Sequence, residues 1–255
     1  MDKEVRKEFR LFLKDSVRKM TDFSQTDQNK GVEAPPVEKP YPREAQLIDL
    51  PPKGEWKNLQ EIDLISALDK RESRRNYLDN PLSQEELSFL LWATQGIRGR
   101  PFPSRGHAFR TVPSAGCRHT FETYLALLNV QGLEEGIYRY LPLSHQLLVE
   151  FTLEGLREKI VEATLGQAFV ANSALLFIWT TIPYRMEWRY GMASHKVIAL
   201  DAGHVCQNLY LACEAVGAGT CAIAAYDQTL ADNLIKVDGE DEFVIYMAPV
   251  GKVRT

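Results

Sequence analysis

Residues 193–216 constrain the fold more than any other part of the chain. They form the longest uninterrupted helical pattern, they are apolar on more than one face, and Gly217 ends the pattern. A helix that is apolar all round is buried. The chain must therefore cover this helix with other elements or share it with a second copy of itself, and the pattern fits both arrangements.

The rest of the chain alternates helical and strand patterns. Strand patterns occupy residues 120–130, 175–182, 220–225 and 243–250, and residues 136–140 and 146–151 predict a hairpin around Pro142. Helical patterns occupy residues 63–69, 84–97 and 153–169. Ser83 and Glu86 have capping-box spacing, and Asp227 is suited to cap one more helix. Helices outside a mostly antiparallel sheet give an α+β fold.

The first 54 residues differ from the body of the chain. Residues 3–18 place apolar and charged side chains at helical spacing, which predicts a short amphipathic helix that needs a surface to lie on. Residues 21–54 are rich in proline and polar residues and predict an extended arm with little structure of its own. Residues 55–255 are enough for one domain with a full core.

Composition limits the classes of function. The formal net charge is −4, and no basic patch is large enough for a nucleic-acid role. The N-terminal residues carry charges of both signs and no apolar run, so we expect no signal peptide, no membrane anchor and a cytoplasmic protein. The four cysteines form no Cys-x-x-Cys pair and no two histidines have metal-ligand spacing, so no metal site is predicted.

Arg71, Ser73 and Arg75 stand at alternate positions between a short helical pattern and Pro81. Alternate side chains of an extended backbone point to one side, so two guanidinium groups and a hydroxyl group would converge on one phosphate or polyol. Taken alone, such a cluster is more often a solvated basic turn than a binding site.

Further motifs follow this cluster in a fixed order. They are residues 71–96, Pro113-Ser114-Ala115-Gly116, Asp201-Ala202-Gly203-His204 with Gln207-Asn208-Leu209, and Gly217-Ala218-Gly219-Thr220 leading to Ala224-Ala225-Tyr226-Asp227. In these motifs, over residues 63–252, the chain resembles the nitroreductase-like FMN-dependent oxidoreductases, especially the branch that includes the thiazole/oxazole peptide dehydrogenases. The resemblance implies a nitroreductase-like fold with the long helix at a homodimer interface and with arm exchange between protomers.

The resemblance also implies how the phosphate end of FMN is bound. Arg71, Ser73 and Arg75 match the family signature that contacts the phosphate, the ribityl chain and the pyrimidine edge. A cation near N1 and O2 would stabilise the negative charge that develops there. Family members carry basic residues after the final strand, where Lys252 and Arg254 stand here, and a solvated chain terminus fits these two residues equally well.

Two small-residue segments would approach the flavin ring. By the resemblance, the loop of Pro113, Ser114, Ala115 and Gly116 lies beside the ring, and a plain tight turn would look the same. The backbone N–H groups of Ala224 and Ala225 would point toward N5, and their small side chains would leave one face of the ring clear.

Arg189-Tyr190-Gly191 stands where the peptide azoline dehydrogenases carry Lys-Tyr-Gly, whose lysine and tyrosine assist deprotonation. Arginine keeps its proton in the working pH range, so azoline chemistry is put in doubt and Tyr190 remains the candidate proton donor. A Ser114–His204–Asp201 hydrolase is not supported, because the Gly-x-Ser-x-Gly motif is absent.

The sequence thus predicts an FMN-dependent oxidoreductase. NADH or NADPH would give a hydride to the flavin in a ping-pong cycle, and a planar small-molecule acceptor such as a nitroaromatic compound or a quinone would take the electrons. Two alternatives stay open: an azoline or other peptide-modifying dehydrogenase, and a flavin-binding protein without redox turnover.

Overall fold

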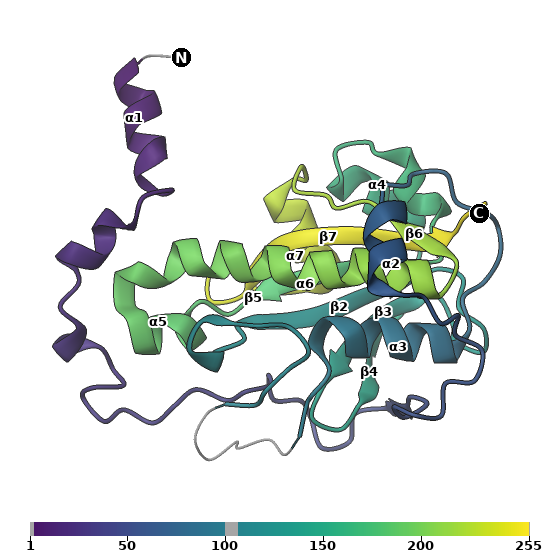
Figure 1. Ribbon diagram of the computed structural model, residues 1–255, viewed down its shortest axis with the longest axis horizontal. Coiled ribbons are helices and arrows are strands. Elements are labelled where there is room, and N and C mark those ends of the chain that lie inside the picture. Colours follow the sequence, from purple (N-terminus) through teal and green to yellow (C-terminus); the bar gives the residue numbers. More distant parts are fainter. Residues whose placement is uncertain (1–2, 100–106, 255) are drawn as a thin grey trace.

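One antiparallel sheet forms the centre of the molecule (Figure 1). The computed structural model describes residues 3–99 and 107–254. Within these residues the sheet has seven strands in the order β1-β4-β3-β2-β5-β7-β6, with every neighbouring pair antiparallel. The strands are β1 (Leu47–Asp49), β2 (Phe121–Leu127), β3 (Gly136–Leu141), β4 (Gln146–Phe151), β5 (Leu175–Thr181), β6 (Ala218–Thr220) and β7 (Phe243–Lys252).

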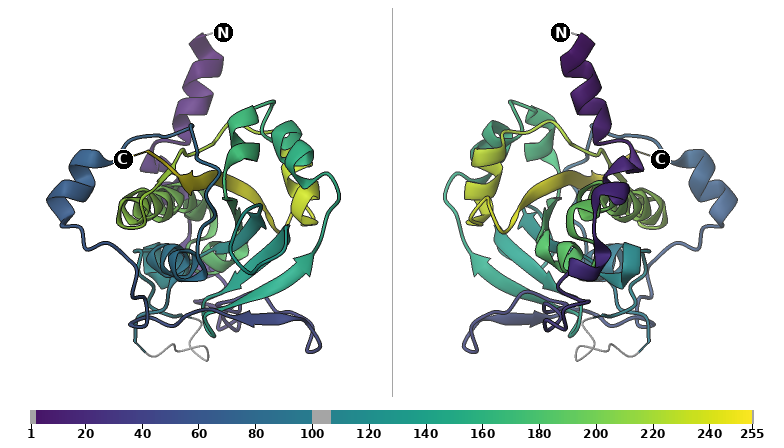
Figure 2. Two further views of the ribbon diagram at one scale, coloured as in Figure 1. Left: turned by 90° about the vertical axis from the view of Figure 1, so that its right-hand side faces the viewer. Right: turned by 90° about the vertical axis from the view of Figure 1, so that its left-hand side faces the viewer.

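Helices cover both faces of this sheet (Figure 2). α3 (Gln84–Gln95) and α6 (His195–Ala215) lie on one face, and α4 (Leu156–Ala163) and α7 (Gln228–Ile235) lie on the other; α2 (Leu64–Lys70) lies beside α6, and α5 (Tyr184–Tyr190) leads into it. Leu125 and Leu127 of β2 pack in the core with α3 and α6, and Tyr124 and Ala126 pack in the core with α4 and α7. The central strands are therefore buried on both sides.

The predicted α+β fold, with its antiparallel sheet and long central helix, is confirmed. The capping box is also present, since Ser83 Oγ accepts from the Glu86 N–H at 3.2 Å and Glu86 Oε2 accepts from the Ser83 N–H at 2.9 Å. No helix among the described residues is long and apolar enough to cross a bilayer.

Two predicted element boundaries are wrong. The helix expected over residues 153–169 is only α4, because Leu165 and the glycine after it adopt positive φ angles of 56° and 80° and turn the chain out of the helix. The strand expected over residues 220–225 is β6, which ends at Thr220. Beyond it only Ile223 pairs with Met247 of β7, so the rest of that segment is free to form a turn.

α6 is buried on its inner side only. Ile198, Val205 and Leu209 are buried in the core, whereas Gly203 is exposed and Leu200 is 55% exposed. Of the two arrangements left open by the sequence, cover of this helix by the chain alone is therefore not observed, and its sharing with a second copy stays a prediction. The outer side of α6 is open, next to α2, which also exposes apolar side chains.

The arm lies along the body of its own chain for most of its length. Val37 and Leu50 are buried, and β1 extends the edge of the sheet by pairing with β4. The expectation that the arm has little structure of its own is wrong for residues 47–49, because they form this edge strand. Since these contacts are all within one chain, exchange of the arm between protomers stays a prediction.

The predicted N-terminal helix is shorter than expected, and it stands away from the body. α1 spans Lys3–Leu11 and is followed by a 3₁₀ turn over Asp15–Met20. Figure 1 shows both elements beyond the end of the sheet near α5. The chain is fastened at that end by Trp188, whose Nε1 donates to the Val32 carbonyl at 3.0 Å and whose carbonyl accepts from the Gln28 N–H at 2.9 Å.

A buried ion network holds the middle of the arm. Glu122 Oε1 lies 2.5 Å from Arg185 Nη2, and Glu122 Oε2 lies 3.6 Å from Arg139 Nη1. Glu122 also accepts the Lys39 N–H at 2.8 Å, and Arg139 donates to the Lys39 carbonyl at 2.9 Å. Burial by itself would raise the pKa of Glu122, but the arginines hold that pKa below its ordinary value. The carboxylate thus keeps its charge and joins the arm to β2, β3 and α5.

Glu122→Gln should destabilise the protein by about 3–5 kcal/mol, because it leaves the buried Arg185 guanidinium without its countercharge, whereas Arg139 keeps its ion pair with Glu150 at 2.9 Å. Urea unfolding followed by circular dichroism measures the loss. Glu162→Gln, at an exposed position of α4, is the matched control and should change the free energy of unfolding by less than about 0.5 kcal/mol. A loss no larger than that of the control would contradict the role given to Glu122.

Candidate functional site

Tyr210 of α6 contacts both Arg71 and Ser73 of the predicted cluster. The Arg71 guanidinium lies over the Tyr210 ring, 5.5 Å from its centre, and Ser73 Oγ lies 2.9 Å from Tyr210 Oη. Tyr210 Oη also accepts the backbone N–H of Ala222 at 2.9 Å. One phenol therefore joins the segment after α2 to the segment after β6.

The same cluster is held against β6 by its backbone. Ser73 pairs with Thr220 in a parallel bridge, and the Arg74 N–H donates to the Thr220 carbonyl at 2.9 Å. Arg74 lies on the other side of this extended segment, against the backbone of Gly219. The predicted alternation is thus confirmed for Arg71 and Ser73, which share Tyr210.

Three arginines line a cavity of about 500 Å³ next to this segment. Arg74, Arg75 and Arg254 contribute to its wall together with Ser73 and Glu72, and the Glu72 carboxylate pairs with Arg74 at 2.9 Å. Arg75 also lies over the Phe169 ring at 5.9 Å, and Arg74 Nε is buried without a hydrogen bond among the described residues. Such a concentration of guanidinium groups around one cavity suits an anion, and a phosphate group in particular.

Lys252 is not part of this cavity. Its ammonium group pairs with Glu86 and donates to the Val216 carbonyl at 2.6 Å, which ties the end of β7 to α3 and to the end of α6. Of the two basic residues predicted after the last strand, the structure therefore brings Arg254 to the cavity and gives Lys252 a structural role.

Ala224 and Ala225 lie in the turn that leads from β6 to α7, and both are exposed. Gln167 Nε2 donates to the Ala225 carbonyl at 2.9 Å, and Asp227 Oδ1 caps α7 by accepting the Leu230 N–H at 2.9 Å. The predicted cap is confirmed. The turn starts two residues after Ala222, whose N–H is bound by Tyr210, and its other end is held by Gln167.

The loop of Pro113, Ser114, Ala115 and Gly116 lies elsewhere, at Asp201 of α6. Asp201 Oδ2 accepts the Ala115 N–H at 3.2 Å and is also hydrogen-bonded by the Ser114 side chain. Burial raises the pKa of Asp201, and the hydrogen bonds from the loop oppose that rise. The aspartate thus fixes the loop against the N-terminal half of α6.

Tyr190 packs on the same loop. Gly116 has a φ of 57°, and a Cβ atom there would lie 2.6 Å from Tyr190 Oη and 2.7 Å from Arg189 Nε. The Arg189 guanidinium lies over the Tyr190 ring at 5.5 Å. Gly116 is therefore required both by its backbone angle and by the closeness of these two side chains.

The geometry rules out the Ser–His–Asp hydrolase. The Ser114 side chain is hydrogen-bonded to the Asp201 carboxylate, and His204 Nδ1 lies 3.7 Å from Oδ1 of the same carboxylate. The histidine is therefore not the partner of the serine. The nearby His119 is no base either, because burial lowers its pKa to about 2.

The predicted site residues thus form two groups in one chain. The Tyr210 group holds Arg71, Ser73, Arg75, Arg254 and the Ala224–Ala225 turn, and the Asp201 group holds Pro113–Gly116 and Tyr190. Asp201 and Tyr210 are nine residues apart on α6, so they leave the helix on opposite sides, about 14 Å apart along its axis. Sequence reasoning missed Tyr210, although a polar-tipped aromatic between Leu209 and Leu211 of a helix is a signal for such a role.

A family model described as the nitroreductase family matches residues 68–252, which include both groups apart from Arg254. The chain belongs to the nitroreductase family. The resemblance inferred from the motifs is thereby confirmed.

Individual nitroreductase relatives agree with this assignment. A protein of Methanocaldococcus jannaschii that bears the name nitroreductase is 33% identical over 195 residues, which cover 76% of this chain and 93% of that protein. A crystal structure of a Ralstonia eutropha protein assigned to the nitroreductases has a TM-score of 0.66 at 25% identity, covering 87% of this chain and 98% of that one.

The peptide-processing branch is also represented among the nitroreductase relatives. The trifolitoxin-processing protein TfxB of Rhizobium leguminosarum bv. trifolii is 25% identical over 169 residues, which cover 63% of this chain. The match spans 45% of TfxB, so less than half of that protein corresponds to this one.

Gly116→Ala should displace the loop from Tyr190 and destabilise the protein by more than a positive φ angle alone would. Gly155→Ala is the matched control, because Gly155 has a similar φ of 67° but its Cβ would meet its nearest atom at 3.6 Å. Urea unfolding should show that the control lowers the free energy of unfolding by about 1–2 kcal/mol and that Gly116→Ala lowers it by more. Equal losses would show that the loop accepts a side chain here.

Proposed function

We propose that this protein is an FMN-dependent oxidoreductase that takes a hydride from NADH or NADPH and passes the electrons to a planar acceptor of the nitroaromatic or quinone type. The observation that carries the proposal is the Tyr210 group. Arg71 and Ser73 meet there beside a cavity lined by Arg74, Arg75 and Arg254. Membership of the nitroreductase family supports the redox class.

The residues present fit this cofactor. A dianionic phosphate needs several cations, and guanidinium groups offer it paired hydrogen bonds. Ser73 adds a hydroxyl group for the ribityl chain, and the exposed Ala224–Ala225 turn offers backbone N–H groups without a bulky side chain. Bound FMN supplies hydride transfer in two half-reactions, so the protein need supply no nucleophile.

The chain's own residues would then bind, orient and deliver protons. Tyr190 is the proposed proton donor, because its hydroxyl group lies against the Gly116 loop and it can give up a proton. Arg189 stays protonated and is suited to stabilise negative charge near that hydroxyl group. Asp201 acts by holding the loop in place.

We further propose that a second copy of the chain completes the site. The two groups lie on opposite sides of α6 within one chain, and the outer side of α6 is open. Two copies that pack their α6 helices antiparallel across that open side would bring the Tyr210 group of one protomer level, along the helix axis, with the Asp201 group of its partner. A two-fold arrangement of this kind would create two identical sites.

A peptide-modifying dehydrogenase is the second candidate. The match to TfxB, whose name describes trifolitoxin processing, favours it, and Tyr190-Gly191 is retained from the azoline dehydrogenase motif. Arg189 in the place of the lysine argues against azoline oxidation by the same proton transfer.

The direct test is to purify the protein, reconstitute it with FMN and record its absorbance spectrum, then add NADH or NADPH without oxygen. We expect a flavin spectrum that the nicotinamide bleaches and a quinone restores. Absence of bound flavin would overturn the proposal. Bound flavin that no nicotinamide reduces would favour a carrier, and oxidation of a heterocyclised peptide would favour the second candidate.

Arg71→Ala should raise the dissociation constant for FMN about tenfold or more, because a charge-assisted hydrogen bond contributes about 1.5–3 kcal/mol. Titration of flavin fluorescence measures it. Tyr210→Phe keeps the ring under Arg71 but removes the hydroxyl group that orders Ser73, so we expect a smaller rise. Arg43→Ala, at an exposed position of the arm, is the control. Unchanged affinity in Arg71→Ala would remove that residue from the site.

A further inference from the structure

The N-terminal segment, residues 3–20, stands almost clear of the body of the protein. It comprises α1, a short turn and the 3₁₀ turn, and Figure 2 shows α1 projecting outward. Every described residue of the segment is exposed except Val17, which is partly buried. Phe9, Leu13 and Met20 are 75%, 67% and 72% exposed. Apolar side chains gathered on a surface in this way mark a place that binds something else.

α1 has an apolar side and a basic side. Val5 and Phe9 are four residues apart, so they lie on one side of the helix. Lys3, Lys7 and Arg10 are spaced by four and three residues and lie together on another side. Helices with aromatic or aliphatic residues on one side and Lys and Arg on the other are typical of segments that lie in the surface of a lipid bilayer.

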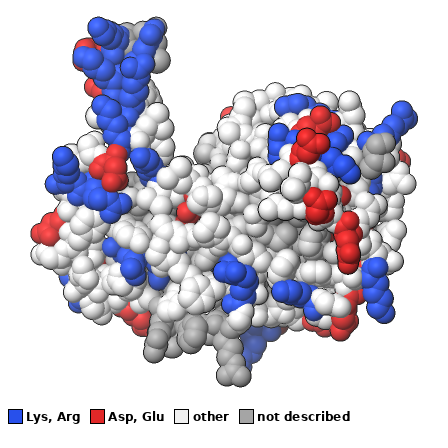
Figure 3. Space-filling model, in the orientation of Figure 1, with Lys and Arg blue, Asp and Glu red and all other residues white. Residues whose placement is uncertain are grey.

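The charge of the N-terminal segment is opposite to that of the rest of the chain. Residues 3–20 contain seven Lys and Arg and three Asp and Glu, a net charge of +4, so the remaining residues carry −8. Two of the three carboxylates are paired inside the segment, Glu4 with Lys7 at 2.6 Å and Asp15 with Arg18 at 2.9 Å. In Figure 3 the basic side chains gather on α1. An anionic surface would therefore attract this end of the molecule and repel the body.

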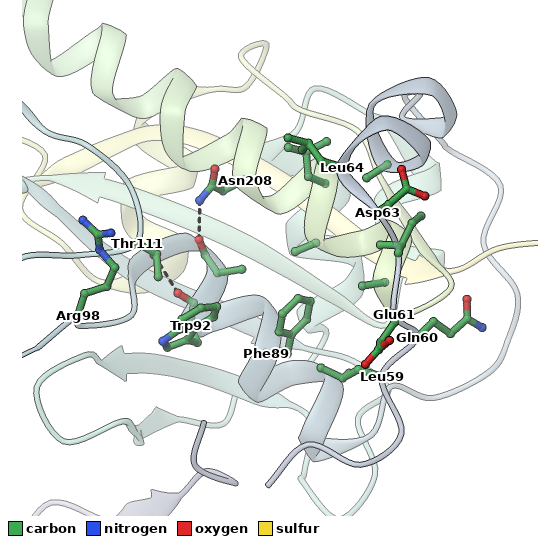
Figure 4. Close-up of a pocket in the computed structure, with 16 residues that line it drawn as sticks. Leu59, Gln60, Glu61, Asp63, Leu64, Phe89, Trp92, Arg98, Thr111 and Asn208 are labelled. Atoms are coloured by element: carbon green, nitrogen blue, oxygen red, sulfur yellow. Dashed lines mark hydrogen bonds between the residues drawn. The ribbon is translucent and has the colours of Figure 1, made fainter. Parts of the chain in front are cut away.

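The apolar groove of its own chain does not take up the segment. This groove of about 1050 Å³ lies between α2, α3 and α6, and Asn208 and Leu211 of the C-terminal half of α6 line it (Figure 4). The chain that carries the segment is fastened at Trp188, near the N-terminal end of α6. Since α6 has 21 residues, its two ends are about 30 Å apart.

The apolar side chains of the segment also do not form one helical row. Phe9 belongs to α1, Leu13 lies in the turn after it, and Met20 ends the 3₁₀ turn. A groove in a protein binds a helix through anchors that recur at regular helical spacing. The boundary between lipid headgroups and acyl chains is fluid, so it can take up apolar side chains from all three parts of the segment. The distribution thus favours a lipid surface over a protein groove.

We infer that the N-terminal segment binds the surface of an anionic lipid bilayer. Its apolar side chains enter the boundary between headgroups and acyl chains, and its lysines and arginines face the lipid phosphates. Attachment of this kind is reversible and needs no spanning helix, and none is found among the described residues. It does not depend on the proposed flavin chemistry.

Co-sedimentation of the full-length protein with vesicles tests the attachment. The protein should bind vesicles made of phosphatidylglycerol and phosphatidylcholine in equal parts, and it should bind pure phosphatidylcholine about tenfold more weakly or less, because the basic residues then lose their counterpart. Added salt should weaken the binding to the anionic vesicles, because it screens the charges. A protein that stays in the supernatant with both kinds of vesicle would overturn the inference.

Phe9→Asp/Leu13→Asp should lower the partition coefficient for the anionic vesicles about tenfold or more, because two apolar side chains no longer leave water. Leu165→Asp is the matched control, since Leu165 is 62% exposed but lies on the body. Circular dichroism should show all variants folded, because the substituted side chains are exposed. Equal vesicle binding by the double variant and the control would contradict the inference.

A second pair of variants separates the place of the charge from its amount. Arg6→Glu/Arg10→Glu and the control Arg43→Glu/Lys159→Glu, at exposed positions of the body, change the net charge equally. Only the first should lower the partition coefficient about tenfold or more. An equal loss in both would overturn the inference. If light scattering shows that the first variant alters the oligomeric state while vesicle binding is retained, the segment belongs to a protein interface and the inference is wrong.

Discussion

The inner side of α6 packs on the sheet through Ile198, Val205 and Leu209, and this contact fixes the position of Asp201 and Tyr210, to which the candidate site residues are attached in two groups. Each such side chain contributes about 1.5–3 kcal/mol when it leaves water. With the helix held in this way, Asp201 reaches the Pro113–Gly116 loop and Tyr210 reaches the Arg71 segment. Both groups of site residues are therefore anchored to the core through α6.

Electrostatics divides the cations of this protein into two kinds. Arg139 and Arg185 are buried and paired with Glu122, so their guanidinium groups serve to hold the arm and α5 in place. Arg71 and Arg75 have aromatic rings beneath them instead of carboxylates, which leaves their hydrogen-bond donors for a ligand. The difference in partners separates structural arginines from candidate binding arginines more clearly than exposure does.

The fold of this protein does not by itself determine its reaction. The fold and the family assignment follow from the sheet, α6 and the match over residues 68–252. The reaction depends on a few side chains, and here Arg189 takes the place of a lysine in the motif of the peptide-modifying branch. Substrate class therefore rests on the site and not on the fold.

The sequence by itself determined the α+β class, the capping box at Ser83, the cap at Asp227 and the placing of Arg71 and Ser73 on one side of their segment, because each depends on patterns among residues close together in the chain. Only the tertiary structure decided that Tyr210 joins two segments and that Lys252 is taken by Glu86, since those partners are far apart in sequence. It also decided that the arm lies on its own body and that the site residues form two groups on opposite sides of α6. Hydrophobic periodicity predicts that a side chain is buried, but which distant segment covers it is fixed only when the whole chain packs.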